Sequence, residues 1–439
     1  MSHVFHRNSN FTPPIVQRGE GVYLYDTQGK QYLDGSGGAA VSCLGHGDAK
    51  VTDAIKSQLD QVAFAHTGFF TSAPAEALAD KLIAHAPDGL DKVYLVSSGS
   101  EAIEAALKLS RQYFLEIDQP SRTKVIARRQ SYHGNTLGAL AAGGNLIRRK
   151  PFAPLMIETS HIAPCYEYRD RRADETSAEY GLRIANELET EIKRLGPENV
   201  MAFVAEPVVG ATAGAVPPVA GYFKRIREIC DKHGVLLILD EIMCGMGRTG
   251  TLFAIEQDGI SPDITTIAKG LGAGYQPIGA MLCRSKIHDT IASGSGFFQH
   301  GHTYLGHPVA AAAGLAVLTR LIDDGLVAQS MAMGQQLQDA LVSAFGQHPN
   351  IGDIRGRGLF RGLEFVADRD TKTPFSPDIL ISKRLKEATF DAGLICYPMS
   401  GTIDGVNGDH LLLAPPFILD SSHIDEIIGK LTTAFNEVF

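Results

Sequence analysis

The sequence has few features of a membrane, secreted or nucleic-acid-binding protein. No apolar stretch reaches the roughly 18 residues that a transmembrane helix needs. Residues 1–7 lack the basic, apolar and small-residue regions of a secretory signal. A formal net charge of -9, without a long run of one sign, offers no field to attract nucleic acid or anionic lipid. We therefore expect a cytoplasmic protein with neither membrane nor nucleic acid as its partner.

Cysteine is also scarce, and the 6 cysteines are not arranged in C-x-x-C pairs. This spacing favours isolated, reduced thiols over disulfides or a zinc site. The nearest approach to a metal motif is the group His300, His302 and His307. No carboxylate or thiol accompanies these histidines at a suitable spacing, so we interpret the group as incidental and predict no metal site.

The chain does contain enough apolar material for a large core, since 44% of its 439 residues are hydrophobic, and its length indicates two or more domains. Short runs rich in Val and Ile alternate with segments of helical period. This pattern predicts an α/β fold with a parallel sheet covered on both faces. The predicted strands are residues 92–97, 123–127, 202–205, 235–239, 264–267 and 278–283. The predicted helices include residues 100–115 and 221–233, the second of them ended by Gly234.

The two ends of the chain have a different pattern. Residues 21–33 predict a turn-linked pair of short strands, residues 351–366 a second pair, and residues 421–439 a final amphipathic helix. We expect a large domain over residues 66–325, and a smaller α+β domain built from residues 1–65 and 326–439.

The first candidate functional motif is the segment 96–102, VSSGSEA, which leads from a predicted strand into a predicted helix. Small residues such as Ser98, Gly99 and Ser100 let backbone N–H groups and hydroxyls surround a phosphate, and the helix N-terminus adds partial positive charge. The same arrangement is common in helix capping, so the motif alone leaves both interpretations open.

The second motif is Asp240 and Glu241, which follow the apolar run LLIL. Ligands bind at the carboxyl ends of strands in open α/β sheets. A buried carboxylate there needs a cationic partner, because an unpaired buried charge is costly or becomes protonated. A protonated pyridine nitrogen is one such partner; a salt bridge or a magnesium ion is the alternative.

The third motif is Lys269, at the end of a predicted strand and beside Gly270, Gly272 and Gly274. Lysine in such a crowded, partly dry place loses its proton readily, as an amine must before it attacks an aldehyde. The alternative is the solvated surface charge that most lysines are. The three motifs together match the phosphate, the ring nitrogen and the aldehyde of pyridoxal phosphate (PLP).

Several ordered motifs make the chain resemble the class III aminotransferase family. The segment 236–250, LLILDEIMCGMGRTG, continuing through PDI at 262–264 to AKGL at 268–271, is similar to the family signature. Further agreement spreads over essentially the whole chain: GEGVYL at 19–24, SYHG at 131–134, AEP at 205–207, HTY at 302–304 and RGLFRG at 357–362. The resemblance implies a fold type I, PLP-dependent transferase.

The resemblance also implies roles for single residues. Lys269 would form a Schiff base with the cofactor and, once released by substrate, shuttle a proton between the substrate carbon and the cofactor. Asp240 would keep the pyridine nitrogen protonated. Tyr132 and Ile242 would cover the two ring faces. Gly99 and Ser100 would bind the phosphate.

Four further residues complete the predicted cofactor site. Glu206 matches a family acid beside the cofactor, and Thr303 matches a hydroxyl offered to the phosphate across a dimer interface. The resemblance therefore implies a homodimer, with a tetramer as a further option. Ser98 and His133 join the set through their motifs, although His133, like Tyr132, has the alternative of an ordinary core residue.

One departure from the family concerns the substrate. Many omega-aminotransferases of the family carry an arginine shortly before a C-terminal Pro-Pro-Phe motif, where it clamps carboxylates. Here residues 405–417, GVNGDHLLLAPPF, contain no arginine. Either the clamp comes from another position or the preferred acceptor differs. Arg361, Arg357 and Arg7 are possible replacements, with salt bridges as the simpler role for each.

The predicted reaction is transfer of an amino group from a primary amine or omega-amino acid to a 2-oxo acid, such as pyruvate or 2-oxoglutarate. It would run as two half-reactions through pyridoxamine phosphate. An aminomutase or racemase, using the same lysine and acid, is the alternative within PLP chemistry. A non-catalytic α/β binding protein is the alternative outside it.

Overall fold

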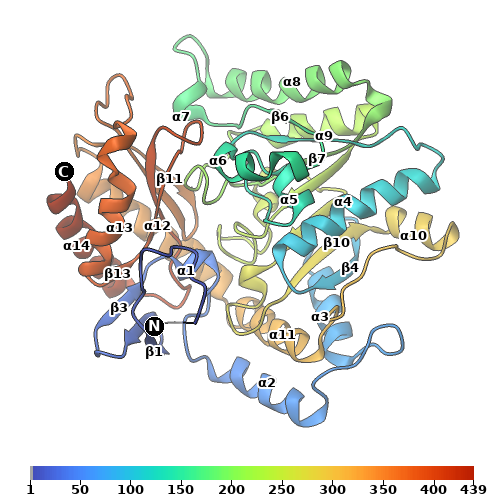
Figure 1. The fold of residues 1–439 in the computed structure, drawn as a ribbon, viewed down its shortest axis with the longest axis horizontal. Coiled ribbons are helices and arrows are strands. Elements are labelled where there is room, and N and C mark those ends of the chain that lie inside the picture. Colours follow the sequence, from blue (N-terminus) through green and yellow to red (C-terminus); the bar gives the residue numbers. More distant parts are fainter. Residues whose placement is uncertain (1–2) are drawn as a thin grey trace.

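A seven-stranded sheet forms the centre of the larger part of the molecule (Figure 1). The computed structural model describes residues 3–439. In spatial order the strands are β4 (Leu90–Val96), β10 (Gly279–Arg284), β9 (Ile264–Ile267), β8 (Leu236–Asp240), β7 (Val200–Ala205), β5 (Lys124–Arg128) and β6 (Thr159–Ile162). Each of the six predicted strands is present, with ends shifted by at most a few residues, while β6 is an addition. The α/β fold class is confirmed.

One strand departs from the predicted parallel arrangement. β10 runs antiparallel to both of its neighbours, β4 and β9, whereas β6, β5, β7, β8 and β9 are mutually parallel. A parallel pair needs a crossover of about a dozen or more residues, usually a helix. Between β9 and β10 the chain forms only the 3-10 helix η4 (Lys269–Leu271), so it turns back instead. The carboxyl ends of β4, β8 and β9 still meet at one edge, because Gly279 lies opposite Val96.

Helices cover both faces of this sheet, and the strands alternate their side chains between two cores. Phe203 and Leu237 pack into one core with Ile226 of α9 (Tyr222–His233). Ala202 and Ile238, one position along, pack into the other with α4 (Gly99–Glu116). The period of two is the pleat of the strand. Because both faces are buried, these strands read as continuous apolar runs.

The two helices that the sequence predicted by residue range are present with nearly the predicted ends. α9 ends at Gly234, whose φ of 62° suits glycine, and α4 spans the predicted helix with one extra residue at each end. The helices are α1 (Gly37–Ala40), α2 (Ala49–Gln61), α3 (Ala73–Ile83), α4 (Gly99–Glu116), α5 (Leu137–Ala142), α6 (Leu146–Arg149), α7 (Glu167–Asp170), α8 (Ser177–Leu195), α9 (Tyr222–His233), α10 (Ser285–Ser293), α11 (Pro308–Asp323), α12 (Leu326–Phe345), α13 (Ile381–Asp391), α14 (Ser421–Val438) and the 3-10 helices η1 (Lys150–Leu155), η2 (Pro197–Asn199), η3 (Ala254–Asp258) and η5 (Pro377–Ile379).

The two ends of the chain lie together at the left of Figure 1. β1 (Val16–Glu20), β2 (Tyr23–Asp26), β3 (Gln31–Asp34) and β13 (Leu394–Ile395) form one small sheet, in which Leu394 pairs with Leu33. β11 (Ile351–Arg357), β12 (Phe360–Phe365), β15 (Asp409–Leu413) and β14 (Tyr397–Ser400) form a second. Both predicted strand pairs are present. The domain boundaries near residues 65 and 325 stay a prediction.

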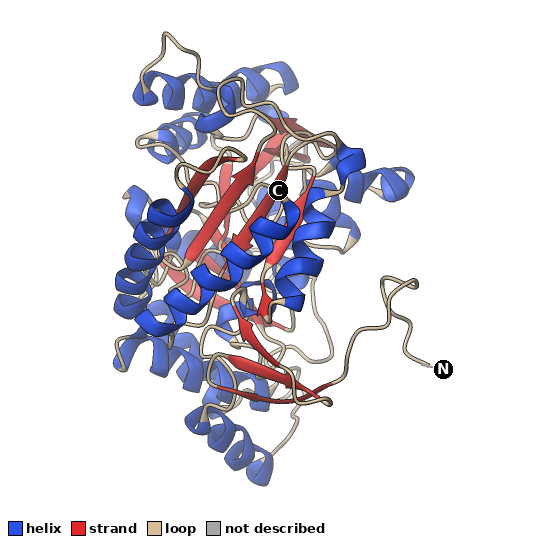
Figure 2. Cartoon of the chain, turned by 90° about the vertical axis from the view of Figure 1, so that its left-hand side faces the viewer, coloured by secondary structure: helices blue, strands red, loops and turns tan. Residues whose placement is uncertain are grey.

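Figure 2 shows the strands between layers of helix and the stretch before β1 projecting away as a loop. All six cysteines are free thiols. Within residues 3–439, no helix is long and apolar enough to cross a membrane.

Candidate functional site

A cavity of about 460 Å³ opens where β4, β7, β8 and β9 end. Segments that follow these strands, and the segment after β5, supply its walls. All predicted site residues except Thr303 line it: Ser98, Gly99, Ser100, Tyr132, His133, Glu206, Asp240, Ile242 and Lys269. Residues far apart in the chain are therefore brought to one place by the parallel strands.

Lys269 enters the cavity from a strained turn. Its φ is 42°, in the left-handed region that side chains other than glycine rarely adopt. Its carbonyl accepts from the amides of Gly272 (3.1 Å) and Ala273 (2.9 Å), which hold the turn in place. Strained backbone of this kind persists only where its surroundings fix it, and it gathers at functional sites.

The surroundings of the Lys269 amine favour its neutral form. Burial lowers the pKa of Lys269 below its usual value, and the charge of Arg148 acts in the same direction. The negative charges of Asp240 and Glu206 oppose the shift without reversing it. A larger fraction of this amine is therefore unprotonated, and able to act as a nucleophile or base, than in an exposed lysine.

Asp240 ends β8 with its side chain buried. One carboxylate oxygen accepts from the amide of Ile242 at 3.0 Å, and the other lies 2.8 Å from Nδ1 of His133. Because the carboxylate can only accept, Nδ1 of His133 carries the hydrogen and donates it. The pair fixes the orientation of a buried acid at the cavity wall.

Glu206, directly after β7, is a second buried acid. Its Oε1 accepts from the amide of Tyr132 at 3.3 Å, and its Oε2 lies 3.8 Å from the guanidinium of Arg128. Burial raises the pKa of Glu206, against the opposing charges of His133 and Arg128. Glu206 lines the cavity with Arg128 as its partner, and its place beside the cofactor stays a prediction.

The segment predicted to bind a phosphate lies at the start of α4 and lines the cavity. Ser98 caps this helix by accepting from the amide of Glu101 at 3.3 Å, and Ser100 Oγ accepts from the amide of Asn135 at 3.0 Å. A Cβ added to Gly99 would lie 2.8 Å from Ile242 Cδ1, and one added to Gly134 would lie 2.6 Å from Ser100 Oγ. Glycine at both positions keeps the cradle open.

Thr303 lies outside the cavity, exposed in the segment between α10 and α11. Its predicted contact with a phosphate involves a second copy of the chain, so it stays a prediction. Glu241, the neighbour of Asp240, points away from the cavity and accepts from the amides of Ala254 (2.5 Å) and Ile255 (3.0 Å). Of the two acids after β8, only Asp240 belongs to the site.

The candidate carboxylate clamps named from sequence have other partners. Arg357 pairs with Asp258 at 2.7 Å. Arg361 is buried and donates to Gln338 Oε1 and to the carbonyls of Gly356 and Gly334. Arg7 is exposed on the stretch before β1. None of the three lines the cavity.

Several wall residues were not found by sequence reasoning. They are Val41, Gly134, Ala211, Met243, Gly274, Gln276, Pro277 and Ile278. Gly134 stands in the quoted SYHG motif and Gly274 beside Lys269, so their motifs could have indicated them. Val41 and Ala211 carry no local signal, because only the tertiary fold brings them to the strand ends.

The residues around the cavity fit PLP. Nε2 of His133 and Oε2 of Glu206 are buried without a hydrogen-bond partner among residues 3–439. Such atoms at a cavity wall are available to a polar ligand, since a buried polar atom left unpaired is costly. The cradle at Gly99 suits a phosphate, and Tyr132 and Ile242 suit the faces of a flat ring.

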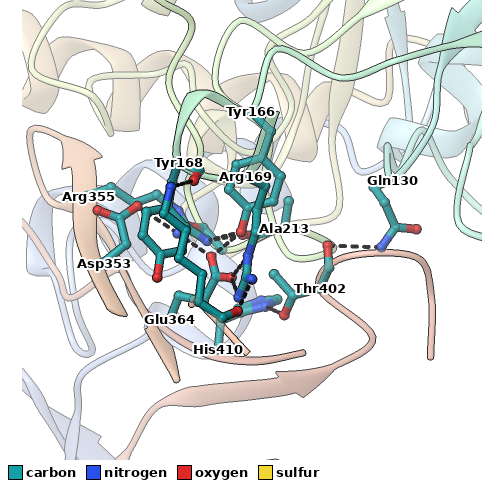
Figure 3. Close-up of polar contacts among 12 residues, drawn as sticks. Gln130, Tyr166, Tyr168, Arg169, Ala213, Asp353, Arg355, Glu364, Thr402 and His410 are labelled. Carbon is teal, nitrogen blue, oxygen red and sulfur yellow. Dashed lines mark hydrogen bonds and ion pairs between the residues drawn. The ribbon is translucent and has the colours of Figure 1, made fainter. Parts of the chain in front are cut away.

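A buried ion-pair network stiffens the region beside the cavity (Figure 3). Glu364 on β12 accepts from Arg355 at 2.6 Å, from Arg169 at 2.7 Å and from the hydroxyl of Tyr166. Arg355 also donates to the carbonyl of Gly214 at 2.8 Å. The network thus joins the C-terminal sheet to the chain around α7 and to Gly214, three positions after the wall residue Ala211.

Fold and cavity together define a fold type I transferase of the aminotransferase class. The family model described as "Aminotransferase class-III" matches residues 4–435. The chain therefore belongs to the class III aminotransferase family and is an aminotransferase, as the sequence motifs predicted.

Individual relatives agree with this assignment. An uncharacterized aminotransferase of Schizosaccharomyces pombe is 47% identical, with 98% of this chain and 94% of the relative aligned. The chloroplastic gamma aminobutyrate transaminase 3 of Solanum lycopersicum is 37% identical, over 98% of this chain and 82% of the relative. The omega transaminase of Pseudomonas jessenii, solved in complex with PMP, is 32% identical, with a TM-score of 0.91 over 97% of this chain and 93% of that chain.

Proposed function

We propose that this aminotransferase holds PLP on Lys269 and transfers an amino group from a primary amine or omega-amino acid to a 2-oxo acid. One observation carries the proposal: a lysine whose pKa is lowered by burial shares a cavity with a buried acid and a glycine-lined cradle. The gamma aminobutyrate and omega transaminases among the relatives support the choice of donor.

Different residues would bind the phosphate and the ring of the cofactor. Ser98, Gly99 and Ser100 would surround its phosphate at the N-terminus of α4, where the helix dipole favours an anion. Tyr132 and Ile242 would pack against its ring. When bound, PLP supplies an aldehyde for covalent attachment and a ring that accepts electrons from the substrate carbon.

Asp240 and Lys269 would carry the proton chemistry. The Asp240 carboxylate, oriented by His133 Nδ1, would hold a proton on the ring nitrogen. Lys269 Nζ would attach to the aldehyde. Once substrate has displaced this amine, it would move a proton between the substrate carbon and the cofactor. The lowered pKa of Lys269 favours the neutral amine that both tasks require.

The proposal also includes the location, the oligomeric state and the partners of the enzyme. We place it in the cytoplasm as a homodimer, in which Thr303 of each copy would reach the phosphate of the other. A small-molecule amine and a 2-oxo acid are the partners. An aminomutase or racemase would use the same residues, and amino exchange between two separate substrates distinguishes a transaminase from both.

The direct test is reductive labelling of the purified holoprotein. Borohydride should abolish the visible absorption band of bound PLP and leave the cofactor on Lys269 in a peptide map. Lys269→Ala should reduce turnover by at least roughly a thousandfold, because it removes the attachment point and the base together. Lys286→Ala, at an exposed lysine near the start of α10, is the matched control and should leave turnover unchanged. Label on another lysine, or normal turnover of Lys269→Ala, would refute the proposal.

A further inference from the structure

Arg148 is a cation beside the site that the proposed function does not use. It lies on the short helix α6, half-buried, with its guanidinium carbon 4.9 Å from the ring centroid of Tyr132. Tyr132 is a wall of the cavity. The positive charge of Arg148 is within electrostatic range of the Lys269 amine, because it adds to the effect of burial in lowering the pKa of that amine.

The guanidinium of Arg148 has no anionic partner in the part of the chain that the structure describes, residues 3–439. Other arginines near the site have ion-pair or hydrogen-bond partners within the chain. Arg128 faces Glu206, Arg355 and Arg169 share Glu364, and Arg357 pairs with Asp258. Even the neighbouring Arg149 is 3.5 Å from Nδ1 of His161. A half-buried cation left without a counter-charge, in contact with a wall residue of the cavity, is suited to bind an anionic ligand.

The loop that packs beside α6 is held in place by the chain itself. Residues 401–408 approach α6 so closely that a Cβ added to Gly405 would lie 3.6 Å from Leu146 Cβ. Gln130 donates from its side chain to the carbonyls of Gly401 and Thr402. Figure 3 shows Gln130 beside Thr402. Residues 401–408 include no arginine.

His410 completes the anchoring of that loop. Its Nε2 donates to the carbonyl of Ala211, a wall residue of the cavity, at 2.9 Å. Its Nδ1 is left to accept from the hydroxyl of Thr402 at 2.6 Å. Buried polar contacts therefore tie the loop beside α6 to Ala211 in the wall of the cavity.

We propose that Arg148 is the specificity-determining residue that binds the carboxylate of the 2-oxo acid acceptor at the Tyr132 side of the cavity. A guanidinium offers two parallel N–H donors that match a carboxylate, which an ammonium cannot do. Stacking on the Tyr132 ring limits the orientations of the guanidinium and so lowers the entropy lost on binding. This inference rests on the proposed function and adds the residue that recognises the acceptor.

The test compares two acceptors with the same carbon skeleton, pyruvate and propanal, with a primary amine that has no carboxylate as donor. Holoenzymes of the wild type, Arg148→Met and Arg148→Lys are measured. Arg148→Met should raise the KM for pyruvate roughly ten- to a hundredfold, with a smaller change in kcat, because a charge-assisted hydrogen bond is lost. The kcat/KM for propanal should stay unchanged, and Arg148→Lys should lie between the two. Competitive inhibition by propanoate should weaken in parallel, which is a readout of binding without turnover.

Lys150→Met is the matched control, since Lys150 is an exposed cation at the start of η1, two positions along the chain. It should leave the KM for pyruvate unchanged. An unchanged KM in Arg148→Met, or an equal loss for propanal and pyruvate, would overturn the inference while leaving the proposed function intact. A wild-type enzyme that aminates neither acceptor would instead overturn the proposed function and this inference with it. Should Arg148→Met fail to fold, Arg148→Gln and Arg148→Lys provide the same comparison.

Discussion

Asp240 and Glu241 are neighbours in the chain, but their surroundings give them different tasks. The side chain of Asp240 faces the cavity and is oriented by His133, whereas Glu241 binds two backbone amides of η3. Burial raises the pKa of Glu241 to about 8. At this scale the direction of one side chain decides which carboxyl group takes part in the proposed chemistry.

Asp240→Asn should therefore fold and retain a cofactor, yet lose activity by roughly a hundredfold or more. The neutral amide cannot hold a proton on the ring nitrogen as a carboxylate does. Steady-state kcat, together with circular dichroism and the absorption spectrum of bound PLP, provides the measurement. Glu241→Gln serves for comparison and should lower the melting temperature while turnover per folded molecule stays largely unchanged. Equal loss of turnover in the two variants would contradict the assignment of roles.

Single residues also mark the limit of what the sequence could indicate about the site. Lys269, Asp240 and the cradle stand in local motifs, so their types and spacing were sufficient to predict them. Arg148 stands in a plain helical segment, and its approach to Tyr132 is a tertiary contact. Arg357 and Arg361, which the sequence offered as possible carboxylate clamps beside a simpler structural role, have structural partners.

At the scale of elements, the ion-pair network around Glu364 connects β11, β12 and α7. Burial alone would raise the pKa of Glu364, but the charges of Arg355 and Arg169 lower it below its usual value. A carboxyl group with a lowered pKa stabilises the folded state above its unfolded pKa, and this contribution is lost as the pH falls through the folded pKa. The network is thus a source of stability at neutral pH that acid removes.

Glu364→Gln should destabilise the protein by about 3 kcal/mol at neutral pH, because it leaves Arg355 buried without its counter-charge. The difference from wild type should shrink as the pH falls, since a protonated Glu364 resembles the amide. Denaturant unfolding at several pH values measures both effects. Glu387→Gln, in an exposed pair with Lys383 on α13, should change stability by less than about 0.5 kcal/mol. A change for Glu364→Gln as small as that of the control would show that the network contributes little.

β6 and β13, two of the elements that the sequence did not predict, are short and lie at sheet edges. β6 reads Thr-Ser-His-Ile, without an apolar run, and pairs only with β5. β13 has two residues and exists through its pairing with β3, far away in the chain. The antiparallel direction of β10 likewise depends on the length of a connection, which strand composition does not report.

At the scale of the whole molecule, exposed aromatic side chains gather around Thr303. Phe69 is 83% exposed, Phe70 67% and Tyr304 61%. The rings of Tyr304 and Phe64 are 5.7 Å apart, so the segments 64–70 and 302–308 form one surface. Large apolar surfaces on soluble proteins mark interaction sites, and this one fits the proposed homodimer.

We expect sedimentation velocity to give twice the monomer mass of 47.1 kDa. Replacing both Phe69 and Phe70 with Asp should shift the protein to monomers, because charges would be buried without partners at the interface. Turnover should fall as the dimer is lost, since Thr303 would no longer reach the site of a second copy. Leu182→Asp, at an exposed leucine of α8, is the control and should leave the mass unchanged. A wild type that sediments as a monomer at micromolar concentration would refute the dimer.

The sequence alone determined the fold class, the six principal strands, the family and the motifs of the proposed cofactor site. The alternation of apolar runs and the strand-end positions of Asp240 and Lys269 are local properties, which the order of neighbouring residues shows directly. Tertiary structure decided the direction of β10, the outward turn of Glu241, the partners of Arg357 and the approach of Arg148 to Tyr132. These depend on which distant segments pack together, and packing is settled by the burial and pairing of many residues at once.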